Sequence, residues 1–245
     1  MSNPLALFPL ALAAAGGCVD AFQTQQLVAA GLTLKQRSGA LVRALAMGRS
    51  ALLLPLSPAF FVGLAASDGS GALVIDAARS DDEISWQLAD ANVRAVFTMS
   101  ALAGRLGAFP TIVLLDEAPF KARVLGAGRT VDVDLGSHHG LALEGDQTVA
   151  GRDEECVLFY ERADDGGSRR ITLTHRALLA WARTEAAARK VESVEYVTSS
   201  SWSNSAALIR AAAVLLSGAR VETGARAEAT SEYTATDHHG ITHSN

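Results

Sequence analysis

Short apolar segments alternate with helical stretches along most of this chain, and the alternation limits the folds that it can adopt. Short strands separated by helices are typical of α/β proteins, in which helices cover a layered sheet. The segments expected to form strands are nearly all apolar, as in sheets that are buried on both faces. The sequence therefore predicts an α/β fold with a mostly parallel, layered sheet and flanking helices.

The predicted elements follow from the spacing of apolar residues. The predicted strands are short apolar or β-branched runs: Ala51–Leu56, Ala72–Ile75, Ala95–Thr98, Thr111–Leu115, Val131–Leu135, Val157–Tyr160, Glu195–Thr198 and Arg220–Thr223. The predicted helices are Thr33–Met47, Pro58–Ser67, Asp81–Asn92, Ser100–Gly107, Thr174–Lys190 and Asn204–Ser217. Residues 1–224 are expected to form one domain. The polar segment 225–245 is expected to be disordered or partly docked on a partner.

The most informative segment for function is 156–179, CVLFYERADDGGSRRITLTHRALL. It predicts a buried strand at Cys156–Tyr160, a turn at Asp164–Ser168, and a helix over Leu173–Arg189 that Thr174 opens. Ligand loops lie at the carboxyl ends of strands in open α/β sheets. We therefore expect a central strand at Cys156–Tyr160, with the turn exposed at its carboxyl end.

This order of strand, loop and helix resembles the phosphate-binding loop of the adenylate-forming superfamily, which includes acyl-CoA synthetases, non-ribosomal-peptide adenylation domains and luciferases. The family motif reads Tyr-Thr-Ser-Gly-Thr-Thr-Gly-x-Pro-Lys-Gly-Val and is followed by a Thr-His or Ser-His pair. Tyr160, Gly166, Ile171, Thr174 and His175 match it. The positions that depart from it are Glu161, Arg162, Ala163, Asp164, Asp165, Ser168, Arg169 and Arg170.

The resemblance is not confined to this loop. It runs from about residue 25 to about residue 224, because the flanking segments keep the family's order. A late segment, for example, is similar to the family's Leu-x-x-Gly-Ala-x-Val strand, with Leu215, Gly218, Ala219 and Val221 in place. The resemblance implies the fold of the N-terminal part of an AMP-binding domain.

The resemblance also implies a nucleotide-binding loop, but most residues that would bind phosphate are replaced. Such a loop offers backbone N–H groups, small hydroxyls and a cation. Asp164 and Asp165 stand where the family has two threonines, so two carboxylates would face the phosphate oxygens. Like charges about 4 Å apart cost about 1 kcal/mol in water and about 4 kcal/mol at a protein surface. The remaining candidate phosphate-binding residues are Arg169, in the register of the family's lysine, with Gly166, Thr172 and Thr174.

The loop therefore has two interpretations: an ordinary solvated loop with ion pairs to nearby arginines, or a loop that retains nucleotide binding. Relatives often carry an aromatic-His pair that lines the acyl pocket, where this chain has Trp202 without a histidine. Trp202 is thus a candidate pocket residue, with plain packing as the alternative. The family's Mg²⁺-associated glutamate and catalytic lysine have no match after Val221, so no catalytic residue and no metal ligand is assigned.

Composition and charge exclude some other classes. The net charge of −5 and the lack of a basic run longer than Arg169-Arg170 argue against nucleic-acid binding. The apolar segment Leu5–Gly17 has no Lys or Arg before it, so we expect a packed helix rather than an export signal, and it is too short for a span of about 20 residues. With only Cys18 and Cys156, no disulfide framework is expected and a reducing cytoplasm fits.

Histidine pairs are the other candidate ligands in the sequence. His138-His139, and His238-His239 with His243, carry side chains that commonly bind metals. Adjacent side chains point in different directions on a strand or loop, so we interpret both sets as solvated histidines rather than a metal site.

Two functions are consistent with this sequence. The first is a catalytically inactive relative of acyl-activating enzymes that acts as an interaction module and needs no cofactor. The second is a residual adenylating enzyme that binds ATP and Mg²⁺ through Arg169 and Thr172 or Thr174, with the missing groups supplied by a partner chain. A family core that ends near Val221 would expose apolar surface, so we expect a homo- or hetero-oligomer. ATP binding distinguishes the two functions.

Overall fold

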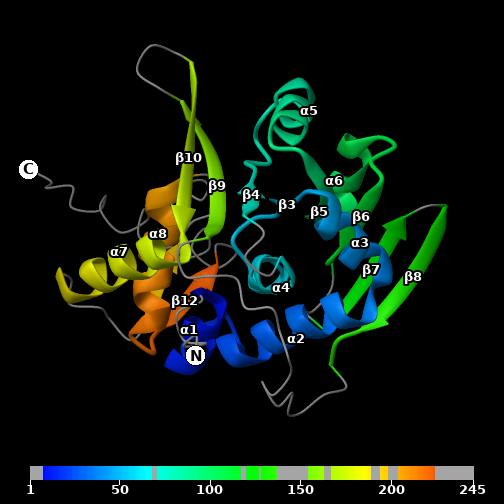
Figure 1. Ribbon diagram of the computed structural model, residues 1–245. Coiled ribbons are helices and arrows are strands. Elements are labelled where there is room, and N and C mark those ends of the chain that lie inside the picture. Colours follow the sequence, from blue (N-terminus) through cyan, green and yellow to red (C-terminus); the bar gives the residue numbers. More distant parts are fainter. Residues whose placement is uncertain are drawn as a thin grey trace, which may run out of the picture.

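Two β-sheets organise the chain in the computed structural model (Figure 1), which describes residues 8–67, 71–116, 120–126, 128–136, 154–162, 167–188, 194–197 and 204–223. The larger sheet runs in the order β10 (Ser168–Thr174), β9 (Glu155–Arg162), β4 (Ala72–Val74), β3 (Arg49–Leu53), β5 (Val93–Thr98), β6 (Thr111–Leu114), β7 (Lys121–Gly126) and β8 (Arg129–Asp134). The smaller sheet runs in the order β11 (Val194–Val197), β12 (Arg220–Thr223), β1 (Cys18–Val19) and β2 (Phe22–Gln23).

The middle of the larger sheet is parallel and its two ends are antiparallel. β9, β4, β3, β5 and β6 run parallel to one another. β10 pairs antiparallel with β9 at one end, and β7 and β8 form an antiparallel hairpin at the other. The prediction of an α/β fold with a mostly parallel sheet is confirmed. The smaller sheet was not predicted as a separate unit, because two of its strands have only two residues each and show no periodicity.

The helices are α1 (Phe8–Ala15), α2 (Thr24–Arg37), α3 (Gly39–Met47), α4 (Pro58–Ala66), α5 (Asp81–Asp90), α6 (Ser100–Ala103), α7 (His175–Ala188) and α8 (Ser205–Leu216). Short polar side chains cap the start of several of them. The Ser57 hydroxyl accepts from the Phe60 N–H at the start of α4, and Ser80 and Glu83 form a capping box on α5. The Asn204 side chain accepts from the Ala207 N–H at the start of α8.

The prediction of one helix over Thr33–Met47 is wrong. Ser38 has an extended backbone, with φ −111° and ψ 92°, and it ends α2. The Ser38 hydroxyl accepts a hydrogen bond from the Leu41 N–H and so opens α3. Continuous apolar spacing concealed this break, because a serine in the middle of such a pattern reads as a tolerated polar residue rather than as a cap.

The expected surroundings of the Cys156–Tyr160 strand are also partly wrong. β9 is an internal strand but not a central one, since only β10 separates it from the edge of the sheet. The segment after the turn is first a strand, β10, and the helix begins only at His175. Ile171 and Leu173 point inward and alternate with outward polar residues, which is the pattern of a strand. The predicted helix, which started at Leu173, therefore began two residues too early.

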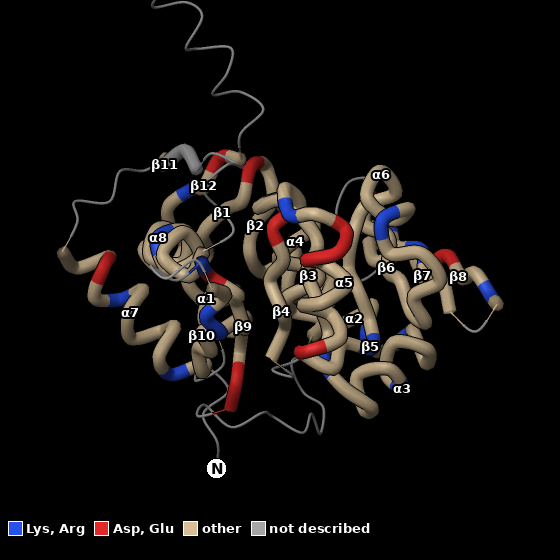
Figure 2. The backbone as a smooth tube through the Cα atoms, turned by 90° about the horizontal axis from the view of Figure 1, so that it is seen from above, with Lys and Arg blue, Asp and Glu red and all other residues tan. Residues whose placement is uncertain are grey.

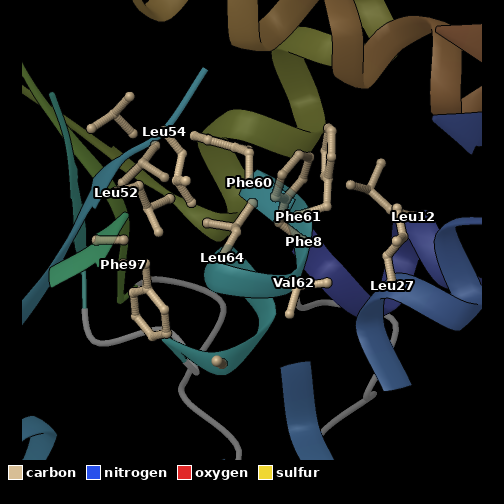
Figure 3. Packing of buried hydrophobic residues seen from close by; sticks show 14 of the residues in the cluster. Phe8, Leu12, Leu27, Leu52, Leu54, Phe60, Phe61, Val62, Leu64 and Phe97 are labelled. Carbon is tan, nitrogen blue, oxygen red and sulfur yellow. The ribbon is translucent and has the colours of Figure 1, made fainter. Parts of the chain in front are cut away.

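Two hydrophobic clusters cover the two faces of the larger sheet. On one face, β-strand side chains pack against α4, which is buried along most of its length, and α2 lies over α4. Figure 3 shows this layer, with Leu52 and Phe97 from the sheet, Phe60, Phe61 and Leu64 from α4, and Leu27 from α2. On the other face, Ile84 and Leu88 of α5 pack against the sheet. The core is thus layered as the sequence predicted.

The N-terminal apolar segment forms part of this core. Phe8 and Leu12 of α1 are buried, and α1 contacts α2, α7 and α8. The buried Thr24 hydroxyl donates to the Leu12 carbonyl, 2.7 Å away, and so links α1 to the first residue of α2. The expected packed helix is therefore present over Phe8–Ala15. Among the described residues, no helix is long and apolar enough to cross a membrane.

We predict that Gly31→Ala destabilises the protein by about 1–3 kcal/mol, the usual cost of overpacking a core. A Cβ atom at Gly31 in α2 would lie 2.5 Å from the Val62 carbonyl oxygen and 2.6 Å from the Ala65 Cβ in α4, so the two helices would have to separate. Denaturant unfolding measures this loss. Gly104→Ala is the matched control, because a Cβ there meets no atom within 4 Å. Equal stability of the two variants would contradict the close crossing of α2 and α4.

Candidate functional site

The candidate site lies at the end of the larger sheet, where β9 and β10 form a hairpin. Residue 162 is opposite residue 168, Glu161 is opposite Arg169 and Tyr160 is opposite Arg170. Most of β9 is buried, whereas Ser168, Arg169 and Arg170 are exposed. The phosphate-loop resemblance therefore falls on the solvent-facing end of an antiparallel hairpin, whose connecting residues 163–166 lie outside the described part of the chain.

Successive side chains at the end of β9 reach opposite faces of the sheet, as the pleat of a strand requires. Tyr160 belongs to the cluster that contains α5, and Phe159 belongs to the cluster that contains α7 and α8. Glu161 follows on the same face as Phe159, and its carboxylate meets α8. Two adjacent residues thus attach one strand to helices in two different layers.

Glu161 occupies the N-terminus of α8. Its Oε1 atom accepts hydrogen bonds from the Ser205 backbone N–H at 2.9 Å and from the Ser205 hydroxyl at 2.7 Å. The first backbone N–H groups of a helix lack partners within the helix and carry a partial positive charge, so a carboxylate there is stabilised by both the hydrogen bond and the helix dipole. An N-terminus of this kind commonly binds anions. Here the anion is a side chain of the protein itself.

Tyr160 is fixed on the other face by two contacts with α5. Its hydroxyl donates to the Asp90 carboxylate, and its ring makes an edge contact with Trp86, with the ring centroids 5.0 Å apart. Burial, and then the hydrogen bond to Asp90 and its charge, raise the pKa of Tyr160 to about 12. The phenol therefore stays protonated at neutral pH and serves as a hydrogen-bond donor, which makes it a structural group.

The described candidate phosphate-binding residues do not converge. Arg169 shares the Glu161 face of the hairpin, whereas Thr172, opposite Leu158, is on the other face. The Thr174 hydroxyl accepts from the Ala177 N–H at 3.1 Å, so Thr174 caps α7 as the sequence predicted. Arg169 and Thr172 are exposed. Gly166, Asp164, Asp165 and Trp202 lie outside the described residues, and their predicted roles stay predictions.

His175, which matches the family motif, is buried beside the N-terminal helix. Its Nδ1 atom accepts a hydrogen bond from the Phe8 backbone N–H at 3.1 Å, and the His175 backbone N–H donates to the Glu154 carbonyl at 3.2 Å. The imidazole is 1% exposed. These contacts join the start of α7 to α1 and to the residue before β9, so the described environment of His175 is a packing environment.

The bond between Glu161 and Ser205 is the feature that sequence reasoning missed. In the sequence Glu161 stands out only as a departure from the family motif, and its partner is 44 residues further along the chain. Asn204 and Ser205 were recognisable as a helix start, which marks a group of N–H donors. Nothing in the sequence, however, indicated which acceptor would reach them, because that depends on how β9 and α8 pack.

Metal binding and redox chemistry have little support in the described part of the chain. There, no group of three or more His, Cys, Asp or Glu residues is placed to hold a metal ion. The histidine pairs at 138–139 and 238–239, and His243, lie outside the described residues. Cys18 and Cys156 are both free thiols, and burial in β9 raises the pKa of the Cys156 thiol, which disfavours the reactive thiolate.

Comparison with solved structures identifies the fold. The chain is similar to ATP-bound MatB from Rhodopseudomonas palustris, with a TM-score of 0.60 and 18% identity over 84% of this chain and 41% of that one. It is similar to the non-ribosomal peptide synthetase FmoA3 with a bound α-methyl-L-serine-AMP, with a TM-score of 0.61 and 15% identity over 88% of this chain and 24% of that one. It also resembles the N-terminal subdomain of Klebsiella oxytoca NpsA, bound to 3-hydroxyanthranilyl-AMSN, with a TM-score of 0.59 and 13% identity over 94% and 57% of the two chains.

The fold is therefore that of the N-terminal part of adenylate-forming enzymes, as the resemblance implied. No protein-family model and no curated protein sequence matches the chain. The chain spans less than half the length of the MatB structure that it resembles. At these low identities the likeness establishes the fold, and the residues of the candidate site have to be assessed on their own chemistry.

We predict that Glu161→Ala destabilises the protein by about 1.5–3 kcal/mol, the usual value of hydrogen bonds to a charged group. Ser205→Ala removes only the hydroxyl bond and should cost less. The double variant should cost less than the sum of the two single variants, since the residues are in contact. Urea unfolding measures all three.

Glu154→Ala is the control for these variants, because this exposed side chain comes just before β9 and its carboxylate has no hydrogen bond or ion pair with the described residues. Only its backbone carbonyl is bonded, to the His175 N–H, and the substitution keeps that bond. It should change stability by less than about 0.5 kcal/mol. Strict additivity of Glu161→Ala and Ser205→Ala would contradict the contact between β9 and α8.

We also predict that one tyrosine resists ionisation. The pKa of Tyr160 is raised from 10.0 to about 12 in the folded protein, so its contribution to stability is fully present below pH 10 and is lost as the pH rises towards 12. Absorbance at the tyrosinate band should show a late phase that Tyr160→Phe removes. Tyr160→Phe should also lower stability at neutral pH by about 1 kcal/mol. A titration of Tyr160→Phe that keeps the late phase would contradict the assignment.

Proposed function

We propose that this protein is a catalytically inactive relative of the acyl-activating enzymes and acts as a binding or interaction module in a complex. The observation that carries the proposal is the carboxylate of Glu161 on the N-terminus of α8. It fills an anion-binding position next to the loop that resembles a phosphate-binding loop, and it does so with the wrong charge for a nucleotide.

A phosphate group at the N-terminus of α8 would meet the Glu161 carboxylate. A phosphate oxygen within about 4 Å of the Glu161 carboxylate would be opposed by about 4 kcal/mol at a protein surface. Displacing the carboxylate would instead break two hydrogen bonds to Ser205, at 2.9 and 2.7 Å. Either route opposes triphosphate binding at this point. Asp164 and Asp165, which stand in place of the family's threonines, add to the negative charge of the same loop.

The remaining polar groups support the same conclusion. Phosphoryl transfer needs several donors and a cation aimed at one group of oxygens. Arg169 and Thr172 are on opposite faces of the hairpin, and Thr174 is engaged in capping α7. Among the described residues, the exposed Arg169 side chain favours residual nucleotide binding, but it provides a cation without a convergent set of hydroxyls.

An interaction role accounts for apolar side chains that are left at the surface. Trp181 of α7 is 51% exposed and Met47 of α3 is 71% exposed. Large exposed apolar groups are commonly covered by a partner. We place this activity in a reducing compartment such as the cytoplasm, because both cysteines are free thiols. The partner in this proposal is a protein or a second copy of the chain, and no cofactor is required.

We predict that the purified protein catalyses no ATP–pyrophosphate exchange with fatty, aromatic or amino acid substrates, and that it shows no ATP binding with or without Mg²⁺. A competent adenylate-forming enzyme assayed in parallel is the positive control. Asp164→Thr combined with Asp165→Thr should raise ATP affinity at most and leave exchange absent, because the donors still do not converge.

Exchange above background by the wild-type protein would overturn the inactive assignment and favour the residual enzyme. ATP binding without exchange would overturn the claim that Glu161 blocks nucleotide binding at the N-terminus of α8. In that case Glu161→Ala should leave ATP affinity unchanged, because the carboxylate would not be opposing the nucleotide.

A further inference from the structure

A groove lined by arginines runs along α3 at the opposite end of the larger sheet from the β9–β10 hairpin. Two hollows of about 420 and 390 Å³ share the residues Ala40, Arg43 and Gly126, so they lie next to each other along α3. The walls of the groove are α3 on one side and the β7–β8 hairpin on the other, and Figure 1 shows these elements side by side. We call this surface the α3 groove.

The α3 groove has a strong positive charge in a protein whose net charge is −5. Arg37, Arg43, Arg94 and Arg129 line it, and its described lining contains no carboxylate. Figure 2 shows blue segments on α3, β5 and β8, the elements that carry three of these arginines. The arginines come from four separate elements, so the charge extends along the groove rather than around a single point.

Three of these arginines have no counter-charge among the described residues. The side chains of Arg43, Arg94 and Arg129 are exposed and form no hydrogen bond or ion pair with the described part of the chain. Elsewhere, by contrast, Arg105 pairs with Asp81 and Arg123 pairs with Asp132. Asp132 is adjacent to Val131 on β8, but strand alternation directs it to the other face of the hairpin, where it meets Arg123.

Apolar side chains are exposed along the same groove. Met47 is 71% exposed and Val131 is 52% exposed, and both line it. Val42, on the neighbouring turn of α3, is 44% exposed. The small residues Ala40, Ala44 and Gly126 also line the groove and allow close approach. No aromatic side chain is among the described lining residues, so the groove lacks the stacking surface with which proteins bind single-stranded nucleic acid.

We propose that the α3 groove docks an acidic, amphipathic segment of a partner protein. Carboxylates of the segment face Arg43, Arg94 and Arg129, and its apolar side chains cover Met47 and Val131. Charge complementarity identifies the occupant as acidic, and the exposed apolar side chains identify it as a polypeptide face rather than a small anion. The proposal names the kind of partner for the interaction function proposed above and rests on that function.

The test uses a fluorescent synthetic peptide of roughly 14 residues, about four helical turns, with leucines on one helical face and glutamates on the other. Fluorescence anisotropy with the full-length protein should show saturable binding that weakens as salt is raised. Arg43→Gln combined with Arg129→Gln should weaken it about tenfold, since two ion pairs are lost. Met47→Ser should weaken it severalfold through lost apolar contact.

Two controls make the result specific. Arg183→Gln removes an exposed arginine from α7, away from the groove, and should leave binding unchanged. A peptide with serine in place of leucine keeps the charge but should bind about tenfold more weakly, because it has lost the apolar face.

Absence of binding, or equal binding by the wild-type protein and the Arg43→Gln, Arg129→Gln variant, would overturn the proposal. Equal affinity for the serine peptide, or displacement of the leucine peptide by an equal concentration of inorganic pyrophosphate, would show a simple anion site and would also overturn it. These outcomes are independent of pyrophosphate exchange. The docking proposal for the α3 groove can therefore be wrong while the proposal of catalytic inactivity is right, and the inactivity proposal can be wrong while the docking proposal is right.

Discussion

The alternation of side chains along β9 is the constraint on which the arrangement of the molecule depends. β9 pairs with β4 on one side and with β10 on the other, so its pleat places Tyr160 and Glu161 on opposite faces of the sheet. Tyr160 must reach α5, and Glu161 must reach α8. One strand therefore connects the parallel sheet to the helices α7 and α8 and, through them, to α1 and the smaller sheet.

The same constraint bears on function. In a fold shared with adenylate-forming enzymes, the end of β9 is where the resemblance implies phosphate chemistry. Here that end carries a carboxylate, which is already hydrogen-bonded to Ser205 at the start of a helix. A helix N-terminus offers a limited number of free N–H groups, and a side chain that accepts from them competes directly with any bound anion. In the function that we propose, the carboxylate that stabilises the packing of α8 therefore also opposes nucleotide binding.

Local patterns predicted much of the fold and little of the site. Apolar runs located β3, β5, β6 and β9, and caps such as Asn204 located the helices, because these signals involve neighbouring residues. The break at Ser38 was missed because apolar spacing continues across it, and the strand β10 was missed because an exposed, polar edge strand resembles loop sequence. The Glu161–Ser205 bond was beyond reach, because it joins residues 44 apart through the packing of a strand on a helix. Arg169 and Thr172 looked like one site in sequence, yet the pleat of β10 separates them.

Hydrogen–deuterium exchange in the presence and absence of saturating Mg²⁺ and ATP is the most direct measurement of the central claim. The Ser205 amide already donates to Glu161, so it should be protected in the free protein, and the nucleotide should change exchange neither there nor in β9 and β10. Nucleotide-dependent protection of the β9–β10 hairpin together with the first turn of α8 would show that phosphate displaces or bypasses the carboxylate. That result would contradict the account.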